Sequence, residues 1–398
     1  MVIHEIKPEF IPGAKIKVLW IWGCWNKAID RMIGEWLEWV SFVAINTDAQ
    51  DLAASIADRK INIWLNLTKG LGAWANPEIW RKAAEESEAE IKQMLQDTDM
   101  VFITWWMWWW TFTWAGPVIA SIAKGMGILT VAIVTKPFSF EWPKRWMNAE
   151  EWIQKLRDSV DTLIVIPNDK IFTVIDKKTS FKQAFMMIDK ILFLWVQWIS
   201  DLIIKPGDIN IDFADVKKVM ENSWNALLGI GYGAWEKRAV EAARKAIENP
   251  LLEENLDGAK SIIFAVSGWH DLTPVEVREA AAVVEEIIDP DVNFFWWMTL
   301  DDSMDDEVKV IIIATWFQEQ SREDILKKPQ RDILGRPIAR KQSDNFITRW
   351  IRSELQKNQD AMPAYKRKDT VDSEEPNLIE EDTETPAFIR RSLNKEKK

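Results

Sequence analysis

Glycine is scarce in this sequence, and tryptophan fills many places where glycine is expected. The 398 residues include 15 glycines and 26 tryptophans, whereas ordinary usage of roughly 7% would give about 28 glycines. Trp25 lies directly after an apolar run, and Trp74 and Trp142 lie shortly before prolines, all settings typical of turns. We therefore hypothesise that most of these positions are glycine in the natural protein.

Cysteine and histidine are also nearly absent, which excludes two kinds of site. Cys24 alone cannot form an internal disulfide, and His4 and His270 add too few ligands for a Cys/His metal site. The net charge of −12 and the pI near 5.0 argue against nonspecific nucleic-acid binding. Residues Met1–Pro12 lack the apolar segment of a signal peptide, so we expect a cytoplasmic protein.

One uncharged run, Val101–Ala123, is long enough to cross a bilayer. Its tryptophans form a central block, however, whereas membrane-spanning helices gather tryptophan at their ends. With glycine in the block, the run becomes an apolar strand at Met100–Ile103, a loop, and a helix from Pro117. We expect this soluble strand–loop–helix unit and no membrane span.

Apolar β runs alternate with helical patterns along most of the chain, which predicts parallel, doubly wound sheet structure with ligand loops at the carboxyl ends of the strands. A proline-free helical stretch, Ser180–Ile204, separates two such regions. The expected strands are Lys15–Ile21, Phe42–Asp48, Met100–Ile103, Leu129–Val134, Thr162–Ile166, Ser261–Val266, Asn293–Trp297 and Val308–Ala314. The other expected helices are Ala28–Leu37, Pro77–Leu95, Val216–Leu228, Arg238–Glu248 and Pro274–Ile288.

The character of the chain changes after the second region. Glu319–Lys368 shows no sustained apolar periodicity, and Asp369–Thr385 holds eight acids and no base, so both predict a disordered linker. The short apolar segment that follows, ending in Arg390 and Arg391, is typical of a docking peptide on a tether. The expected domains are residues 1–14, an extension; 15–179, a nucleotide domain; 180–205, a central helix; 206–317, a second α/β domain; 318–384, a linker; and 385–398, a docking peptide.

Several long segments, in the order of the family pattern, resemble the FtsZ family of tubulin-like bacterial division proteins. They include Met100–Thr104, Thr130–Glu141, Asp161–Asp169 and Asn210–Lys217, and the resemblance runs from about Lys15 to Phe317. It implies a tubulin-like α/β fold and a GTP-dependent cytoskeletal GTPase that forms head-to-tail filaments in the mid-cell division ring. The resemblance also implies that a terminal peptide docks to membrane-tethering division proteins such as FtsA through Pro386, Phe388, Ile389, Arg390 and Arg391.

The resemblance accounts for the tryptophans, because the family pattern has glycine at 22 of the 26 positions. Some bacterial lineages read the codon UGA as glycine, whereas a common alternative table reads it as tryptophan; deliberate replacement is the competing explanation. Trp105, Trp146, Trp297 and Trp350 are less clear. The 22 positions are Trp20, Trp22, Trp25, Trp36, Trp39, Trp64, Trp74, Trp80, Trp106, Trp108, Trp109, Trp110, Trp114, Trp142, Trp152, Trp195, Trp198, Trp224, Trp235, Trp269, Trp296 and Trp316.

Two loops are candidates for binding phosphate. With glycine restored, both follow apolar strands and precede helices, an arrangement in which backbone amides can approach phosphate oxygens. The first loop alone would also suit a dinucleotide site, but the second matches the tubulin signature except at Phe112, where glycine is missing. The implied GTP-binding residues of the loops are Trp22, Gly23, Cys24, Trp25, Asn26, Trp108, Trp109, Trp110, Thr111, Phe112, Thr113 and Trp114.

The resemblance implies further contacts with GTP. Glu141 and Arg145 would lie near the ribose and phosphates, although from the residues alone a surface ion pair is the plainer interpretation. Asn168 and Asp189 would bind the guanine edge, since a carboxylate can accept both donors that guanine presents. Phe185 would stack on the base, although it could equally be a core aromatic residue.

The implied catalytic residues are Asn210, Asp212 and Asp215, although acids at a helix start also serve as ordinary caps. In the family this loop enters the nucleotide site of the next subunit, where its acids position and polarise the attacking water, with Mg²⁺ neutralising phosphate charge. Such head-to-tail contacts build open filaments. Two alternatives stay open: a filament or interaction protein with a dead nucleotide site, if the tryptophans are real, and an NAD-dependent oxidoreductase, suggested by the first loop alone.

Overall fold

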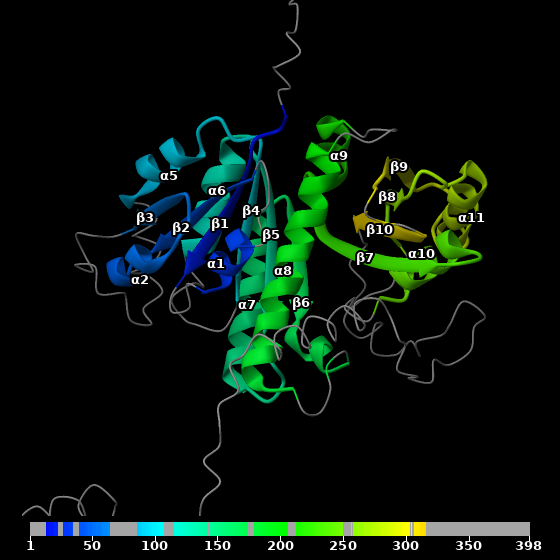
Figure 1. Ribbon diagram of the computed structural model, residues 1–398. Helices are drawn as coiled ribbons and strands as arrows, with labels where there is room; N and C mark the ends of the chain where they lie inside the picture. The colour runs from blue at the N-terminus through cyan, green and yellow to red at the C-terminus, as the bar shows by residue number, and fades with distance from the viewer. Residues whose placement is uncertain are drawn as a thin grey trace, which may run out of the picture. The chain divides into compact units, whose positions relative to one another are not determined.

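The computed structural model (Figure 1) describes most of the chain between residues 13 and 315. Two units are distinguished, Met1–Leu355 and Gln356–Lys398, and every described residue belongs to the first. The expected linker and docking peptide therefore lie outside the described residues. The described residues are 13–22, 27–34, 40–63, 86–106, 115–141, 143–173, 175, 179–205, 212–249, 256, 258–302, 304 and 306–315.

Six parallel strands form the first part of a ten-stranded sheet, in the order β3-β2-β1-β4-β5-β6. Outside the edge strand β3, most of their described side chains are buried, as expected for a parallel sheet that is covered on both faces. The order reverses between β1 and β4, as in doubly wound folds, which confirms the expected class. The strands are β1 (Ile16–Trp22), β2 (Val40–Asn46), β3 (Arg59–Asn62), β4 (Met100–Trp106), β5 (Leu129–Lys136) and β6 (Thr162–Pro167).

Short helices connect these strands. The uncharged run that could have crossed a membrane is divided between strand β4 and helix α6, as expected, and no helix in the described part of the chain is both long and apolar enough to span a bilayer. Of the helix expected at Pro77–Leu95, the described part is α5. The helices are α1 (Lys27–Gly34), α2 (Ala49–Ala54), α5 (Glu88–Leu95), α6 (Ala115–Gly125), α7 (Pro143–Ser159) and the 3₁₀ helix η1 (Asn168–Thr173).

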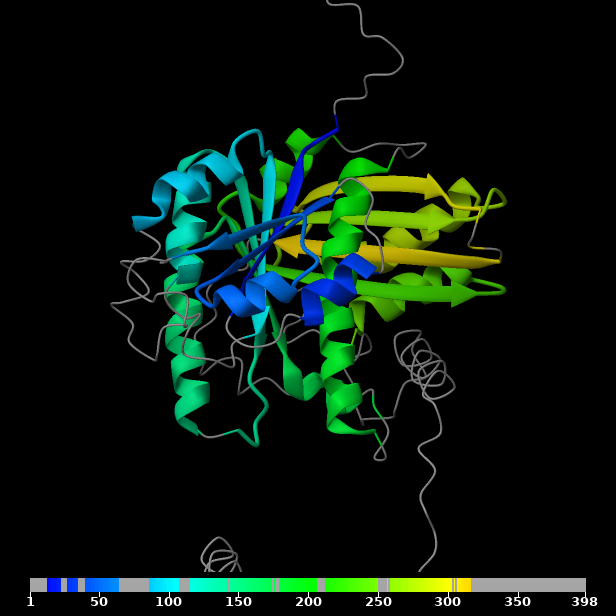
Figure 2. The ribbon, with the colours of Figure 1, turned by 60° about the vertical axis from the view of Figure 1, so that its left-hand side comes forward.

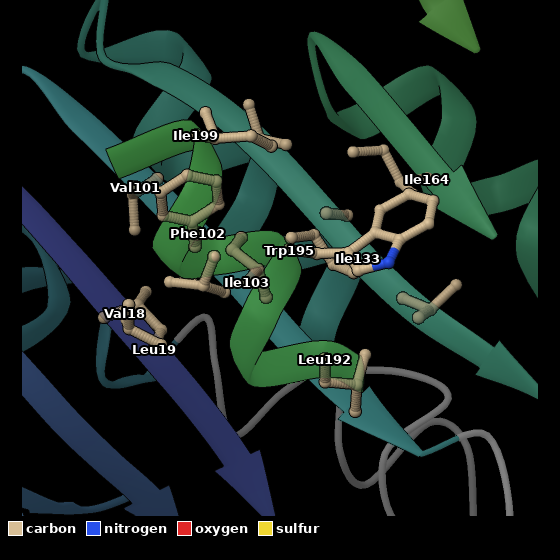
Figure 3. Packing of buried hydrophobic residues seen from close by; sticks show 14 of the residues in the cluster. Val18, Leu19, Val101, Phe102, Ile103, Ile133, Ile164, Leu192, Trp195 and Ile199 are labelled. Atoms are coloured by element: carbon tan, nitrogen blue, oxygen red, sulfur yellow. The ribbon is translucent and has the colours of Figure 1, made fainter. Parts of the chain in front are cut away.

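The long helix α8 (Phe181–Ile204) packs its apolar residues against the parallel strands (Figure 3). It begins with a capping box, in which the Ser180 hydroxyl accepts from the Gln183 amide and the Gln183 side chain accepts from the Ser180 amide. Trp195 fills space between α8 and the strands near Ile133 and Ile164. Because Trp195 is among the 22 positions, we expect closer packing of α8 in a glycine form.

The second part of the sheet is mixed, in the order β7-β10-β8-β9 (Figure 2). Strand β10 runs antiparallel to both β7 and β8, and β9 runs parallel to β8. The first two residues of β7 also pair in parallel with β6, so the two parts are continuous. The elements are α9 (Phe213–Met220), β7 (Trp224–Ala234), α10 (Arg238–Ile247), β8 (Ser261–Gly268), α11 (Pro274–Glu285), β9 (Asn293–Leu300) and β10 (Glu307–Thr315).

The helix expected at Val216–Leu228 is wrong in its second half. Helix α9 ends at Met220, and the chain turns through Asn222, whose φ of 53° lies in the left-handed region that asparagine tolerates. Strand β7 then begins at Trp224. A short apolar run such as Ala226–Leu228 does not distinguish a strand from a helix by periodicity, which explains the error.

Glycine is present where β7 needs it. A Cβ atom added at Gly229, Gly231 or Gly233 would overlap backbone carbonyl oxygens of α10, so this helix can approach the strand closely only against glycine. The chain thus keeps some glycines that packing requires, while tryptophan occupies other glycine-like positions.

Trp235 is the clearest example of a tryptophan in a glycine-like conformation. Its φ is 71°, in the left-handed region that bulky side chains avoid, and its side chain is 87% exposed in the turn between β7 and α10. Trp152 and Trp297 are buried, and their indole nitrogens have no hydrogen-bond partner among the described residues. Burying an N–H group without a partner is costly. These features favour glycine at positions 152 and 235 in the natural protein. They also make position 297, one of the four unclear positions, a further candidate for glycine.

We expect Trp235→Gly, made in the chain as written, to raise the free energy of unfolding by about 1 kcal/mol through relief of left-handed strain. Urea unfolding measures the change. The matched control is Glu236→Gly in the same turn, where φ is not positive; it should lower the free energy, because glycine gives the unfolded chain more freedom. Equal destabilisation by the two substitutions would contradict the interpretation.

We expect the intact mass of the protein isolated from its own cells to fall well below the 46.3 kDa of the sequence as written. Glycine at the 22 positions replaces an indole side chain with hydrogen each time, and the corresponding codons should be UGA. A mass that matches 26 tryptophans, together with UGG codons, would instead show that the tryptophans are real. The backbone of the two expected phosphate loops could then not approach phosphate.

Candidate functional site

Buried polar atoms gather at the carboxyl ends of the parallel strands. Five of them have no hydrogen-bond partner among the described residues, although buried polar groups are normally paired. Carboxyl ends of parallel strands are also where ligands bind in open α/β sheets. Of these residues, only Asn168 was assigned a role from the sequence. The threonines could have been recognised as polar residues within or directly after otherwise apolar strands. The atoms are Thr47 Oγ1, Asn62 Oδ1, Thr104 Oγ1, Thr135 Oγ1 and Asn168 Oδ1.

The two expected phosphate loops follow neighbouring strands. Trp22 ends β1 and the second loop follows β4, and these strands flank the point where the strand order reverses. Gly23–Asn26 and Trp108–Trp114 lie outside the described residues. Strands β1 and β4 nevertheless end at the same edge of the sheet as the unpaired polar atoms.

Acidic residues after β2 lie at this edge as well. The Asp48 carboxylate accepts hydrogen bonds from the amides of Gln50 and Asp51, and so caps α2. Burial, together with the Asp48 carboxylate, raises the pKa of Asp51 above its ordinary value. In the described part of the chain, no three His, Cys, Asp or Glu residues lie close enough to hold a metal ion by themselves.

Glu141 organises the connection between β5 and α7. Its carboxylate is buried and accepts hydrogen bonds from the Phe138 amide at 2.9 Å and from the Arg145 guanidinium at 3.1 Å. The Asp169 carboxylate accepts from the Ser139 amide at 2.9 Å and ties the same connection to η1. The pair of Glu141 and Arg145 is therefore more than a surface ion pair, and sequence reasoning gave Asp169 no role.

The residues expected to bind guanine lie around η1 and the start of α8. Asn168 opens η1 directly after β6 and is 3% exposed, and Asp189 on α8 is 2% exposed. Phe185 is half-buried, with its ring 5.8 Å from that of Phe138. Three further rings of this aromatic cluster are exposed and were not predicted, because no local sequence pattern indicates that they lie together. They are Phe140, Phe172 and Phe181.

The acidic residues lie on α9. Asp212 occupies the N-cap position, yet its side chain makes no capping hydrogen bond and is exposed, so the plain capping interpretation does not hold for it. Asp215 is half-buried in the first turn. Asn210 lies outside the described residues.

Helix α9 lies at the opposite edge of the sheet from the carboxyl ends of β1 and β4. Lys217 donates to the Gly127 carbonyl just before β5, and the Thr162 hydroxyl at the start of β6 donates to the Met220 carbonyl. Both contacts are at the amino ends of the strands. Helix α8 connects the two edges, and its 24 residues span about 36 Å. The acids and the expected nucleotide site are thus too far apart to act together within one chain.

Comparison with known proteins shows the same two-part organisation. Residues 15–176 match the model of the Tubulin/FtsZ family GTPase domain, and residues 225–318 match the FtsZ family C-terminal domain. An empty FtsZ dimer from M. jannaschii is 44% identical, with 76% of this chain and 88% of that chain covered and a TM-score of 0.68. A tryptophan-to-tyrosine mutant of M. jannaschii FtsZ is also 44% identical, with 76% and 91% covered and a TM-score of 0.69.

A more distant likeness concerns the fold alone. A GTPγS-bound protofilament of CetZ2 from Haloferax volcanii is 15% identical, with 86% of this chain and 99% of that chain covered and a TM-score of 0.61. The two consecutive family models and the 44% identity carry the assignment. The chain belongs to the FtsZ family, and its first part is the GTPase domain of that family.

Proposed function

We propose that this FtsZ-family GTPase completes its active site only where two subunits meet head to tail. The observation that carries the proposal is that α9 contacts the amino ends of the parallel strands, whereas β1 and β4, which precede the expected phosphate loops, end at the opposite edge. A second copy can bring its α9 to the first copy's nucleotide edge. Because the contact joins different surfaces of identical subunits, it repeats and gives an open filament, in keeping with the family's filaments in cell division.

GTP is the proposed substrate at the carboxyl edge. The unpaired atoms of Thr104, Thr135 and Asn168 are suited to hydrogen bonds with a polar ligand. The phosphates would lie on the amides of the two glycine-corrected loops, and Asp189 would accept from the guanine edge. The Glu141 carboxylate accepts a hydrogen bond from Arg145, which would hold the guanidinium near the phosphates.

Mg²⁺ is the proposed metal cofactor, and it suits the donors at this edge. Magnesium prefers oxygen ligands, keeps several waters and is usually held together with substrate phosphates. Hydroxyl and carboxylate oxygens of Thr47, Thr104 and Asp51 supply such donors near the strand ends. When bound, the ion would neutralise charge on the phosphates.

The proposed catalytic residues are Asn210, Asp212 and Asp215 of the neighbouring subunit. The exposed Asp212 carboxylate, which makes no cap within its own chain, is available to position water across the contact. Asp215 stands one turn further along the same helix and would polarise that water. Hydrolysis then depends on assembly, because neither edge contains the whole site.

The terminal segment is the proposed docking peptide. Phe388 and Ile389 offer an apolar anchor, and Arg390 and Arg391 can pair with acids on a partner. We propose that the peptide folds on a membrane-tethering division protein such as FtsA and recruits the filament to the mid-cell ring. The polar sequence between residues 318 and 384 would keep that contact away from the filament body.

We expect Asp215→Ala, in the full-length chain with glycine at the 22 positions, to retain GTP binding and lose turnover by about 100-fold, the usual cost of removing a general base. Phosphate release, measured together with nucleotide affinity, separates the two effects. The matched control is Glu221→Ala at the other end of α9, which should keep normal turnover.

Mixing variants tests the shared site directly. Asp189→Ala should fail to bind GTP but still present intact acids, so mixing it with Asp215→Ala should restore some hydrolysis at mixed contacts. Full activity of Asp215→Ala as a dilute monomer would exclude a site shared between subunits.

We expect deletion of residues 386–398 to leave hydrolysis and filament formation intact while abolishing recruitment to vesicles coated with FtsA. The deletion removes the apolar anchor and both arginines but no part of the sheet. The control replaces the basic residues Lys366, Arg367 and Lys368 with alanine and should leave recruitment unchanged. Recruitment that survives the deletion but not the alanine control would transfer the membrane contact to these basic residues.

A further inference from the structure

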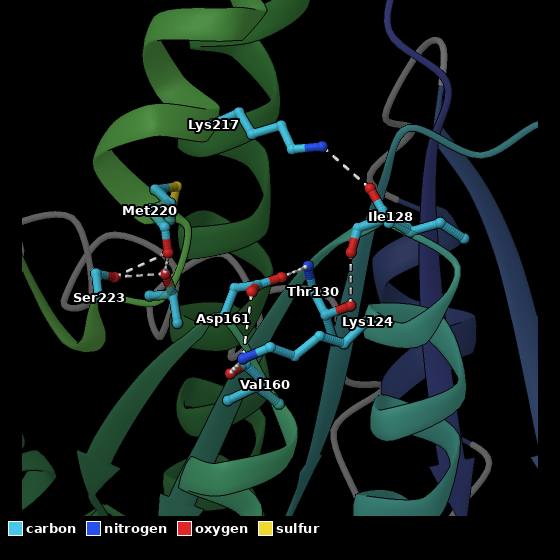
Figure 4. Close-up of polar contacts among 10 residues, drawn as sticks. Lys124, Ile128, Thr130, Val160, Asp161, Lys217, Met220 and Ser223 are labelled. Carbon is cyan, nitrogen blue, oxygen red and sulfur yellow. Dashed lines mark hydrogen bonds and ion pairs between the residues drawn. The ribbon is translucent and has the colours of Figure 1, made fainter.

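The carboxyl end of α9 is held by buried hydroxyl groups. The last carbonyl groups of a helix have no partner within the helix and need other donors. The Thr315 hydroxyl donates to the Val219 carbonyl at 2.9 Å. The Met220 carbonyl is within hydrogen-bond reach of the Thr162 hydroxyl and of the Ser223 hydroxyl, the latter at 2.9 Å (Figure 4).

The two threonines come from different parts of the sheet. Thr162 is the first residue of β6 in the parallel part, and Thr315 is the last residue of β10 in the mixed part. Thr162 also pairs with Trp224, where β6 meets β7. Consecutive carbonyls of α9 are therefore fixed to both parts of the sheet at their junction.

The hydroxyls form a closed buried group. Thr162 and Thr315 are fully buried, and Ser223 is 4% exposed. The hydroxyl oxygens of Thr162 and Ser223 lie 2.8 Å apart, and both are within hydrogen-bond reach of the Met220 carbonyl oxygen. The two hydroxyl protons are therefore shared among three oxygen–oxygen contacts. One hydroxyl donates to the Met220 carbonyl while the other donates to its neighbour. No proton is left for a further partner, so the group is fully used in holding the helix end.

The two ends of α9 differ in exposure. Val216, Val219 and Met220 are buried, whereas Asp212 is exposed at the first turn. Asp215 lies four residues before Val219, which is about 6 Å along the helix axis. A shift or rotation of the Val219 and Met220 carbonyls therefore moves the carboxylates with it.

We propose that Thr162 and Thr315 are positioning residues for hydrolysis: they fix the direction in which α9 presents its acids to the next subunit. The inference rests on the proposed shared site. Neither threonine touches the nucleotide edge, because both hydroxyls contact α9 at the amino ends of the parallel strands. Their loss should therefore lower the turnover of assembled subunits without weakening GTP binding by the monomer.

The test uses Thr315→Val and Thr162→Val separately in the full-length chain with glycine at the 22 positions. Valine keeps the shape of threonine and removes the hydroxyl. We expect each to bind GTP as before and to lose about fivefold in turnover per assembled subunit, the scale of one hydrogen bond. The matched control is Thr130→Val, since the buried Thr130 hydroxyl also donates to a backbone carbonyl, that of Ile128, but does not touch α9.

Rescue distinguishes positioning from general stability. Thr315→Ser restores the hydroxyl and should restore most turnover, while Thr130→Val should lower the melting temperature as much as Thr315→Val yet keep normal turnover. Unchanged turnover in Thr315→Val, an equal loss in Thr130→Val, or no rescue by serine would overturn the inference. If the unsubstituted chain showed no assembly-dependent hydrolysis, the proposed function itself would fail, which is a distinct result.

Discussion

The common direction of strands β1 to β6 is the constraint on which the rest of the structure depends. Parallel pairing places every carboxyl end at one edge of the sheet, which gathers the unpaired threonine hydroxyls and Asn168 there. It equally places every amino end at the other edge. An element that contacts the starts of β5 and β6, as α9 does, is thereby kept away from the carboxyl edge of its own chain.

Helix α8 connects the two edges of the sheet and sets the distance between them. Its apolar residues are buried against the parallel strands, so hydrophobic burial holds it along the whole depth of the sheet. The chain enters α8 beside the expected guanine site and leaves it close to α9. Strand β7 then pairs with both β6 and β10, which lets two threonines from different parts of the sheet hold one helix end. A rigid junction of this kind suits a site completed by a neighbour.

Most strands and helices could be predicted from the sequence because their apolar periodicity is strong. Strands β5 and β6 are nearly continuous apolar runs, and the ends of α8 carry clear signals in Ser180 and Pro206. The helix expected at Val216–Leu228 was wrong because a turn at Asn222 depends on backbone conformation rather than periodicity. Strand β3 was not expected at all, since Arg59–Asn62 is short, partly exposed and lies at the sheet edge.

The sequence by itself determined the family, through long ordered motifs, and the chemical types present at the site, because these are properties of the chain read in order. It also led to the hypothesis that many tryptophans stand where the natural protein has glycine. Only the tertiary structure decided that α9 lies at the opposite edge of the sheet from the carboxyl ends of β1 and β4, that the Glu141 carboxylate is buried, and that Thr162 and Thr315 both contact the carboxyl end of α9. Those facts depend on pairing between residues up to 96 positions apart, and no local pattern of side chains encodes such a pairing.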